Sequence, residues 1–242
     1  KDGCNRHVLI DECRELFGEI YEQIPELPFC NIWTAMQLSS RLPKGALFHM
    51  GVSNTRRCWN MFQLPESVES ACNVGCCGID GCVSTLVGAS LVNPDRLCYV
   101  VVGDLTFFYD LNSLGNHHIG TNLRVMLVNN GRGTEFRLGI HHCNVFGDDA
   151  DKYMAAAGHF GNKSPLLVKH YAEDLGFHYL SATTKEEFMT ALSNFTNPQL
   201  SDHSMILEVF TDSKDESEAL YLMSHIQSDA KGMVRSLSLI HI

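Results

Sequence analysis

The sequence of 242 residues lacks the features that would direct a protein to a membrane or to a nucleic acid. It holds no apolar run near the roughly 20 residues that a membrane-spanning helix needs. Lysine and arginine number 18 against 28 aspartates and glutamates, and they are scattered along the chain. The basic patch of a nucleic-acid-binding protein is therefore missing, and we expect a soluble protein with neither a membrane nor a nucleic acid as partner.

A signal peptide, an internal repeat and a low-complexity segment are also absent from the sequence. The ten cysteines do not have the setting of a disulfide-stapled mini-domain, because the chain is long and several of them lie in apolar runs, as Cys98 does in LCYVVVG. We expect most to be small buried thiols in a cytoplasmic protein. The chain begins at Lys1 without a methionine, and we expect it to be a fragment of a longer polypeptide.

What the sequence does contain is a regular alternation of strand and helix patterns. Apolar runs of β-forming residues lie at 46–51, 97–103, 123–130 and 204–211. Helical patterns lie at 8–24, 31–42, 80–92, 106–116, 165–175, 184–195 and 212–220, the last with a charge-rich start expected to face solvent. Continuously apolar strands alternating with helices predict a parallel α/β sheet flanked by helices on both faces. We divide the chain into a helical arm or linker (1–44) and one domain (45–242).

Two polar residues stand at the ends of neighbouring predicted strands. Asp104 follows the second apolar run and Asn130 ends the third, 26 residues later. That interval holds one helix, a turn and a strand running back in the same direction. A right-handed crossover would bring both residues to the same edge of the sheet, where ligands of open α/β sheets bind.

A carboxylate and an amide oxygen near a backbone carbonyl suit Mg²⁺, which keeps water and substrate phosphate as its other ligands. A helix beginning near Thr106 would aim its free N–H groups at a phosphate. Asp104 would then hold a metal that neutralises a diphosphate in a protein of net charge -10. The residues alone leave a second interpretation open, in which Asp104 only caps a helix and Asn129, Asn130 and Gly131 only form a turn.

The segments GDLTFFYDLNSL and NLRVMLVNNGRGTEF resemble the diphosphate-binding signature of thiamine-diphosphate-dependent enzymes. The earlier segments GVSNTRR and NVGCCGIDGCVSTLVGAS resemble, in the same order, parts of the carboxylate synthase of the menaquinone pathway. The resemblance is clear over about residues 45–136 and implies a Rossmann-like cofactor-binding domain at the C-terminal end of such an enzyme. It also implies a homodimer or homotetramer.

Residue roles follow from this resemblance alone. It implies that Mg²⁺ is bound by Asp104, the side chain of Asn130 and the backbone carbonyl of Arg132. The diphosphate would be lined by Ser53, Gly103, Leu105 and Thr106. Cys77 would lie near the aminopyrimidine, and Ile79 would support the bent cofactor. The cofactor supplies the electron sink in these enzymes, and the protein supplies geometry and a dry site.

The substrate implied by the resemblance is a 2-oxo acid. Arg57 and Phe136 match positions near the substrate, where an arginine pairs with a carboxylate. An arginine expected between Asn73 and Gly75 is Val74 here, so we expect a relative acting on another 2-oxo acid. In the family a glutamate on a separate pyrimidine-binding domain completes the site, and we expect that domain on the same or a partner chain.

Three functions remain open at this point. The first is a carboligase, which decarboxylates a 2-oxo acid and transfers the acyl-anion unit. The second is simple decarboxylation, as in phosphonopyruvate or indolepyruvate decarboxylases, and the third is a non-catalytic diphosphate-binding module. A dinucleotide-binding oxidoreductase is disfavoured, because no G-x-G-x-x-G turn lies at a strand-to-helix junction.

Overall fold

The computed structural model describes residues 5–138, 141–154, 156, 158–159 and 164–226. The α-helices are α1 (Asn5–Glu22), α2 (Asn31–Leu38), α3 (Asn54–Trp59), α4 (Cys82–Val92), α5 (Asp104–Tyr109), α6 (Ala150–Tyr153), α7 (Leu167–Asp174), α8 (Lys185–Phe195) and α9 (Ser213–Ser224). The strands are β1 (Leu47–Met50), β2 (Glu69–Cys72), β3 (Cys98–Gly103), β4 (Leu123–Asn129), β5 (His178–Ala182) and β6 (Met205–Phe210). Short 3₁₀ helices are η1 (Ser39–Arg41), η2 (Leu111–Gly115), η3 (Thr134–Arg137) and η4 (His142–Asp149).

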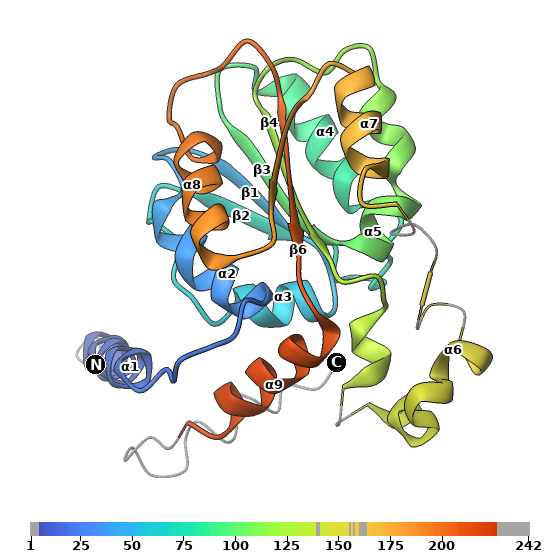
Figure 1. Cartoon of the computed structure of the whole chain (residues 1–242). Coiled ribbons are helices and arrows are strands. Elements are labelled where there is room, and N and C mark those ends of the chain that lie inside the picture. Colours follow the sequence, from blue (N-terminus) through green and yellow to red (C-terminus); the bar gives the residue numbers. More distant parts are fainter. Residues whose placement is uncertain (1–4, 139–140, 155, 157, 160–163, 227–242) are drawn as a thin grey trace.

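The strands form one parallel sheet in the order β2-β1-β3-β4-β6-β5. This confirms the predicted parallel α/β fold, and Figure 1 shows helices on both sides of the sheet. Because all strands run the same way, the carboxyl ends of β2, β1, β3 and β4 lie side by side at one edge of the sheet. The loops after these four strands can therefore contribute to a single site.

Each face of the sheet has its own apolar core. Strand residues alternate between the two faces, so Tyr99 and Val101 pack on one side while Val100 and Val102 pack on the other. Helices α2, α3 and α8 cover the first face, and α4, α5 and α7 cover the second (Figure 1). Burial of a Val or Leu side chain stabilises the fold by about 1.5–3 kcal/mol, and β3 is buried almost throughout.

The sequence analysis missed two strands and two short helices, α3 and α6. Strands β2 and β5 are the edges of the sheet, and their half-exposed sequences ESAC and HYLSA contain no apolar run. Helix α3 has only six residues. The helix expected at 106–116 begins earlier, at Asp104, and is broken at Asp110 into α5 and a 3₁₀ turn.

One cation is fully buried near the amino end of the sheet. The side chain of Arg124, in β4, donates from Nη1 to the carbonyl oxygens of Thr121 (2.8 Å) and Leu123 (2.9 Å). Its Nη2 donates to Ser201 Oγ at 3.0 Å. Burial lowers the pKa of this guanidinium.

Among the described residues, no helix is both long enough and apolar enough to cross a membrane.

Candidate functional site

Asp104 is a buried carboxylate at the junction between β3 and α5. Asp104 is 2% exposed. The strand before it, β3, pairs with β4 so that Gly103 lies opposite Val128. The loop that follows β4 is therefore brought directly to Asp104. The prediction that Asp104 and Asn130 lie close together is confirmed. Their metal-binding roles stay predictions.

The loop after β4 turns three backbone N–H groups toward this carboxylate. Asp104 Oδ2 accepts hydrogen bonds from the N–H of Asn130 (3.1 Å), Gly131 (2.5 Å) and Arg132 (3.2 Å), and Oδ1 accepts from Leu105 N–H (2.7 Å). Gly131 has a φ of 75°, a left-handed conformation that favours glycine. This turn curls the loop around the acid, so the polypeptide itself forms an anion-binding nest.

Two of the three oxygen atoms expected to bind Mg²⁺ belong to this loop, and the third is on the Asp104 carboxylate that the loop encloses. Asn130 Oδ1 accepts from Arg132 N–H at 3.3 Å, so Asn130 and Asp104 share one donor. The carbonyl oxygen of Arg132 accepts from Thr134 N–H at 3.0 Å and keeps a second lone pair. A carboxylate, an amide oxygen and a carbonyl oxygen are the hard donors that Mg²⁺ prefers. The oxygen atoms of Asp104, Asn130 and Arg132 are therefore of the types that bind Mg²⁺.

A later segment covers the loop from the other side. His159 Nε2 lies 3.1 Å from Asp104 Oδ2, within ion-pair distance when the imidazole is protonated, and its ring centroid is 5.4 Å from that of Phe108. A Cβ atom added at Gly133 would overlap the carbonyl oxygen of Ala156. His159 was missed by the sequence analysis, because no motif or strand end points to it.

A cleft of about 1190 Å³ opens beside this loop. It runs between the loop after β4 (residues 130–133, called the Asp104 loop because it encloses that carboxylate), the segment after η3 and the start of α9. The lining residues are Asn130, Gly131, Arg132, Asn144, Gly147, Asp148, Asp151, Gly158, His159, Asp212, Ser213, Lys214 and Ser217. Among them, only Asn130 and Arg132 were expected from the sequence to bind the metal, and the contribution of α9 is a finding of the structure.

The residues expected to contact the diphosphate gather at the same edge of the sheet. Ser53 lies in the loop between β1 and α3 with a φ of 58°, and a Cβ at Gly103 would lie 3.9 Å from Thr55 Oγ1 in that helix. Leu105 and Thr106 belong to the first turn of α5. The loops after β1 and β3 are thus adjacent, because these strands are neighbours.

Cys77 and Ile79 come from the loop between β2 and α4. Cys77 is exposed with a φ of 52°, and its Sγ lies 3.4 Å from the carbonyl oxygen of Val74. Ile79 is partly buried against the second core. Strand β2 is the outermost strand of the sheet and pairs with β1. Both residues therefore lie near the carboxyl ends of the strands, two strands away from Asp104.

The expected substrate arginine has a partner inside the chain. Arg57 donates from Nη1 to Glu135 Oε2 (2.9 Å) and from Nη2 to Glu135 Oε1 (3.0 Å), a bidentate ion pair that joins α3 to η3. The hydrogen bonds to Glu135 raise the pKa of Arg57. Next to this pair, the ring of Phe136 packs edge to face on His141 with centroids 5.2 Å apart. Sequence patterns gave no sign of the role of Glu135.

A second buried acid lies beneath the Asp104 loop. Glu208, in β6, is 1% exposed and accepts hydrogen bonds from Asn129 Nδ2 (2.7 Å) and Tyr179 Oη (2.7 Å). Burial raises the pKa of Glu208 and outweighs these two donors. The network ties β4, β6 and β5 together at the residue immediately before Asn130.

Other candidate sites are weaker. In the part of the chain that the structure describes, no group of three or more His, Cys, Asp or Glu side chains could hold a metal ion. The described cysteines are free thiols. Four are buried, as expected: Cys30, Cys58, Cys82 and Cys98. Three are exposed, which differs from the expectation: Cys13, Cys76 and Cys77.

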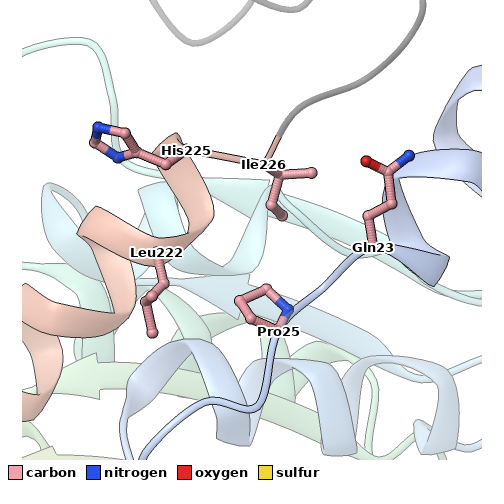
Figure 2. A pocket seen from close by; sticks show the side chains of 5 residues that line it. All are labelled: Gln23, Pro25, Leu222, His225 and Ile226. Carbon is pink, nitrogen blue, oxygen red and sulfur yellow. The ribbon is translucent and has the colours of Figure 1, made fainter.

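A smaller cavity of about 270 Å³ lies at the far end of α9 (Figure 2). Its lining residues are Gln23, Pro25, Leu222, His225 and Ile226. His225 Nδ1 is already 2.7 Å from the carbonyl oxygen of Tyr221. With no second reactive side chain in its lining, this cavity offers less chemistry than the cleft.

Comparison with known proteins finds several carboxylate synthases among the relatives of this chain. The 2-succinyl-5-enolpyruvyl-6-hydroxy-3-cyclohexene-1-carboxylate synthase of Bacteroides fragilis is 34% identical over 196 residues, which is 81% of this chain and 34% of the synthase. Enzymes of the same name from Phocaeicola vulgatus (34% identical over 200 residues, 81% of this chain and 34% of the enzyme) and Christiangramia forsetii (33% over 199 residues, 82% and 33%) also match. No protein-family model matches the chain.

These matches show that the chain is homologous to part of such a synthase. The chain spans about a third of the length of the curated relatives it matches. The similarity extends over about four fifths of the chain, well beyond residues 45–136, which carry the resemblance in the sequence motifs.

Proposed function

We propose that this chain is the thiamine-diphosphate- and Mg²⁺-binding part of an enzyme that decarboxylates a 2-oxo acid and transfers the resulting acyl-anion unit to an acceptor. The observation that carries the proposal is the buried Asp104 carboxylate, enclosed by the loop after β4 at the carboxyl edge of a parallel sheet. The 34% identity to a carboxylate synthase supports the same function.

Each part of the site has a role in this proposal. Asp104, Asn130 and the Arg132 carbonyl hold the metal, and the first turn of α5 directs N–H groups to the diphosphate. When bound, the cofactor supplies the electron sink for decarboxylation. Ile79 supports it from the apolar side, and the covering segment with His159 limits the access of water to the cleft.

The complete enzyme needs more than this chain supplies. In the proposed function a glutamate on a pyrimidine-binding domain, from the same or a partner chain, would supply the proton to the cofactor ring. We expect the chain alone to bind the cofactor and metal but to turn over no substrate, and we expect the assembled enzyme to be a homodimer or homotetramer.

Simple decarboxylation is the second candidate, and the Arg57–Glu135 pair is the observation that favours it. An arginine already paired with a carboxylate on both Nη atoms is less available to a second anion, such as an acidic acceptor. Product analysis on the assembled enzyme separates the two candidates, because only a carboligase forms a product longer than the aldehyde.

The cofactor site is tested by calorimetric titration of the chain with thiamine diphosphate in Mg²⁺ and in EDTA. We expect binding in Mg²⁺ only, and a loss of more than about a hundredfold in Asp104→Ala, because even supporting residues of metal sites contribute 10- to 100-fold. Asp95→Ala is the matched control, since Asp95 is exposed at the opposite end of β3. Equal affinity in wild type and Asp104→Ala would refute the site.

A further inference from the structure

Glu216 is a carboxylate with no exposure to solvent, and it joins two helices that are far apart in sequence. It projects from α9, and its Oε1 and Oε2 lie 3.0 and 3.1 Å from the backbone nitrogen of Asn31, the first residue of α2. Thr211 Oγ1 donates to Oε1 at 2.7 Å. The acid therefore caps α2 from outside and fixes α9 against it.

The contact continues to a third helix. Asn31 Oδ1 accepts a hydrogen bond from Trp59 Nε1, in α3, at 3.0 Å. Hydrogen bonds therefore connect α9 to α3 through α2, by way of Glu216, Asn31 and Trp59. A movement of α9 away from α2 would change the surroundings of this tryptophan.

The other side of α9 belongs to the cleft. Ser213, Lys214 and Ser217 line it, and the residue that leads into the helix, Thr211, donates its N–H to the carbonyl oxygen of Asn129 at 3.1 Å. The position of α9 therefore sets one wall of the cleft, next to the Asn130 loop.

The electrostatic surroundings of Glu216 disfavour its charge. Burial raises its pKa from 4.5 to about 7, against the hydrogen bonds from Thr211 and Asn31, which lower it. The other ionisable groups around it are the carboxylates of Asp104 and Asp215 and the thiols of Cys30 and Cys58. Both carboxylates raise the pKa of Glu216 further.

We propose that Glu216 is a positioning residue whose protonated form holds α9 against α2, and that loss of its proton loosens α9 and widens the cleft. The pKa of the docked acid is above that of an exposed glutamate, so its stabilising contribution is complete below about pH 4.5 and is lost as pH rises through about 7. Between these two values each pH unit lowers the docking equilibrium by up to about tenfold, and above about pH 7 it falls no further. The proposal does not depend on what the cleft binds.

The two tryptophans of the chain, Trp33 and Trp59, make the test direct. Trp33 lies in the first turn of α2 and Trp59 donates to Asn31, so both stand at the junction that Glu216 holds. We would follow tryptophan fluorescence of the whole chain from pH 5 to 9. The expected result is one transition with a midpoint near 7 in wild type, and none in Glu216→Gln.

Two further variants keep the result decisive. Glu218→Gln removes an exposed acid from the same helix and should leave the transition unchanged. Thr211→Val removes a donor that favours the charged acid, so it should move the midpoint upward even if Glu216→Gln fails to fold. A flat wild-type profile, a transition that persists in Glu216→Gln, or an unmoved midpoint in Thr211→Val would overturn the proposal. None of these results depends on cofactor binding, so the two proposals fail separately.

Discussion

The Asp104 loop and the junction of α9 with α2 are both built around a buried carboxylate, yet the two regions differ in what surrounds the acid. Asp104 is encircled by N–H groups of one short loop that also faces a cleft. Glu216 is fully buried, and its partner Asn31 lies 185 residues away in the sequence. A carboxylate at an opening can exchange its donors for a ligand, whereas an enclosed one can only hold elements together.

The comparison also separates two ways in which burial affects an acid. At the α9 junction few donors face the acid, so burial dominates and raises its pKa. At Asp104 the loop presents three N–H groups to one oxygen atom and lies beside an open cleft. We therefore expect the first region to respond to pH and the second to respond to a metal.

The largest effect on stability should come from Glu216→Ala. The change leaves Asn31 N–H without its acceptor and opens a cavity between two helices, so we expect a loss of about 3 kcal/mol in the free energy of unfolding. Urea unfolding at pH 6 measures it, with Glu218→Ala on the exposed side of α9 as the control. Equal losses in the two variants would mean that Glu216 does not join the helices.

An intermediate effect is expected at Glu208, which lies between the two regions. Tyr179→Phe removes one of the two hydrogen bonds to this buried acid, which should cost about 1.5 kcal/mol and raise the pKa of Glu208 further. Since the raised pKa favours the protonated form, the loss should grow as pH rises. Urea unfolding at pH 6 and pH 8 checks this, and a loss independent of pH would contradict it.

The smallest effect is expected at the Arg57–Glu135 pair, because both side chains are partly exposed, at 36% and 23%. Glu135→Gln should cost about 0.5 kcal/mol of stability, in the range of ion pairs open to solvent. A fall in the urea midpoint as large as that in Glu216→Ala would show that the pair is a structural link. Glu69→Gln, which breaks the exposed pair with Arg96, is the control.

The central strands and the Asp104 site could be predicted because they depend on local patterns. Buried parallel strands are continuously apolar, so β1, β3, β4 and β6 were recognised within about two residues. The meeting of Asp104 with Asn130 follows from one strand-helix-strand unit. Edge strands β2 and β5 lack that apolar run, because solvent covers part of their surface.

The long-range contacts could not be predicted in this way. The charge-rich segment 212–220 was expected to face solvent, and this is wrong for Glu216, which is fully buried. Its neighbours Lys214 and Glu218 are exposed as expected. The difference depends on where α2 packs, which no pattern within α9 records. The same holds for Glu135 and His159, whose partners Arg57 and Asp104 lie in distant parts of the sequence.

The buried Arg124 gives the sheet an internal electrical polarity. Its guanidinium sits near the amino end of β4, while the carboxylate of Asp104 is buried at the carboxyl end of β3. In an interior of low dielectric constant these charges are weakly screened. In the proposed function this polarity would attract a metal ion to the carboxyl ends of the strands and repel a diphosphate that arrives without one. We therefore expect the metal to bind before the diphosphate.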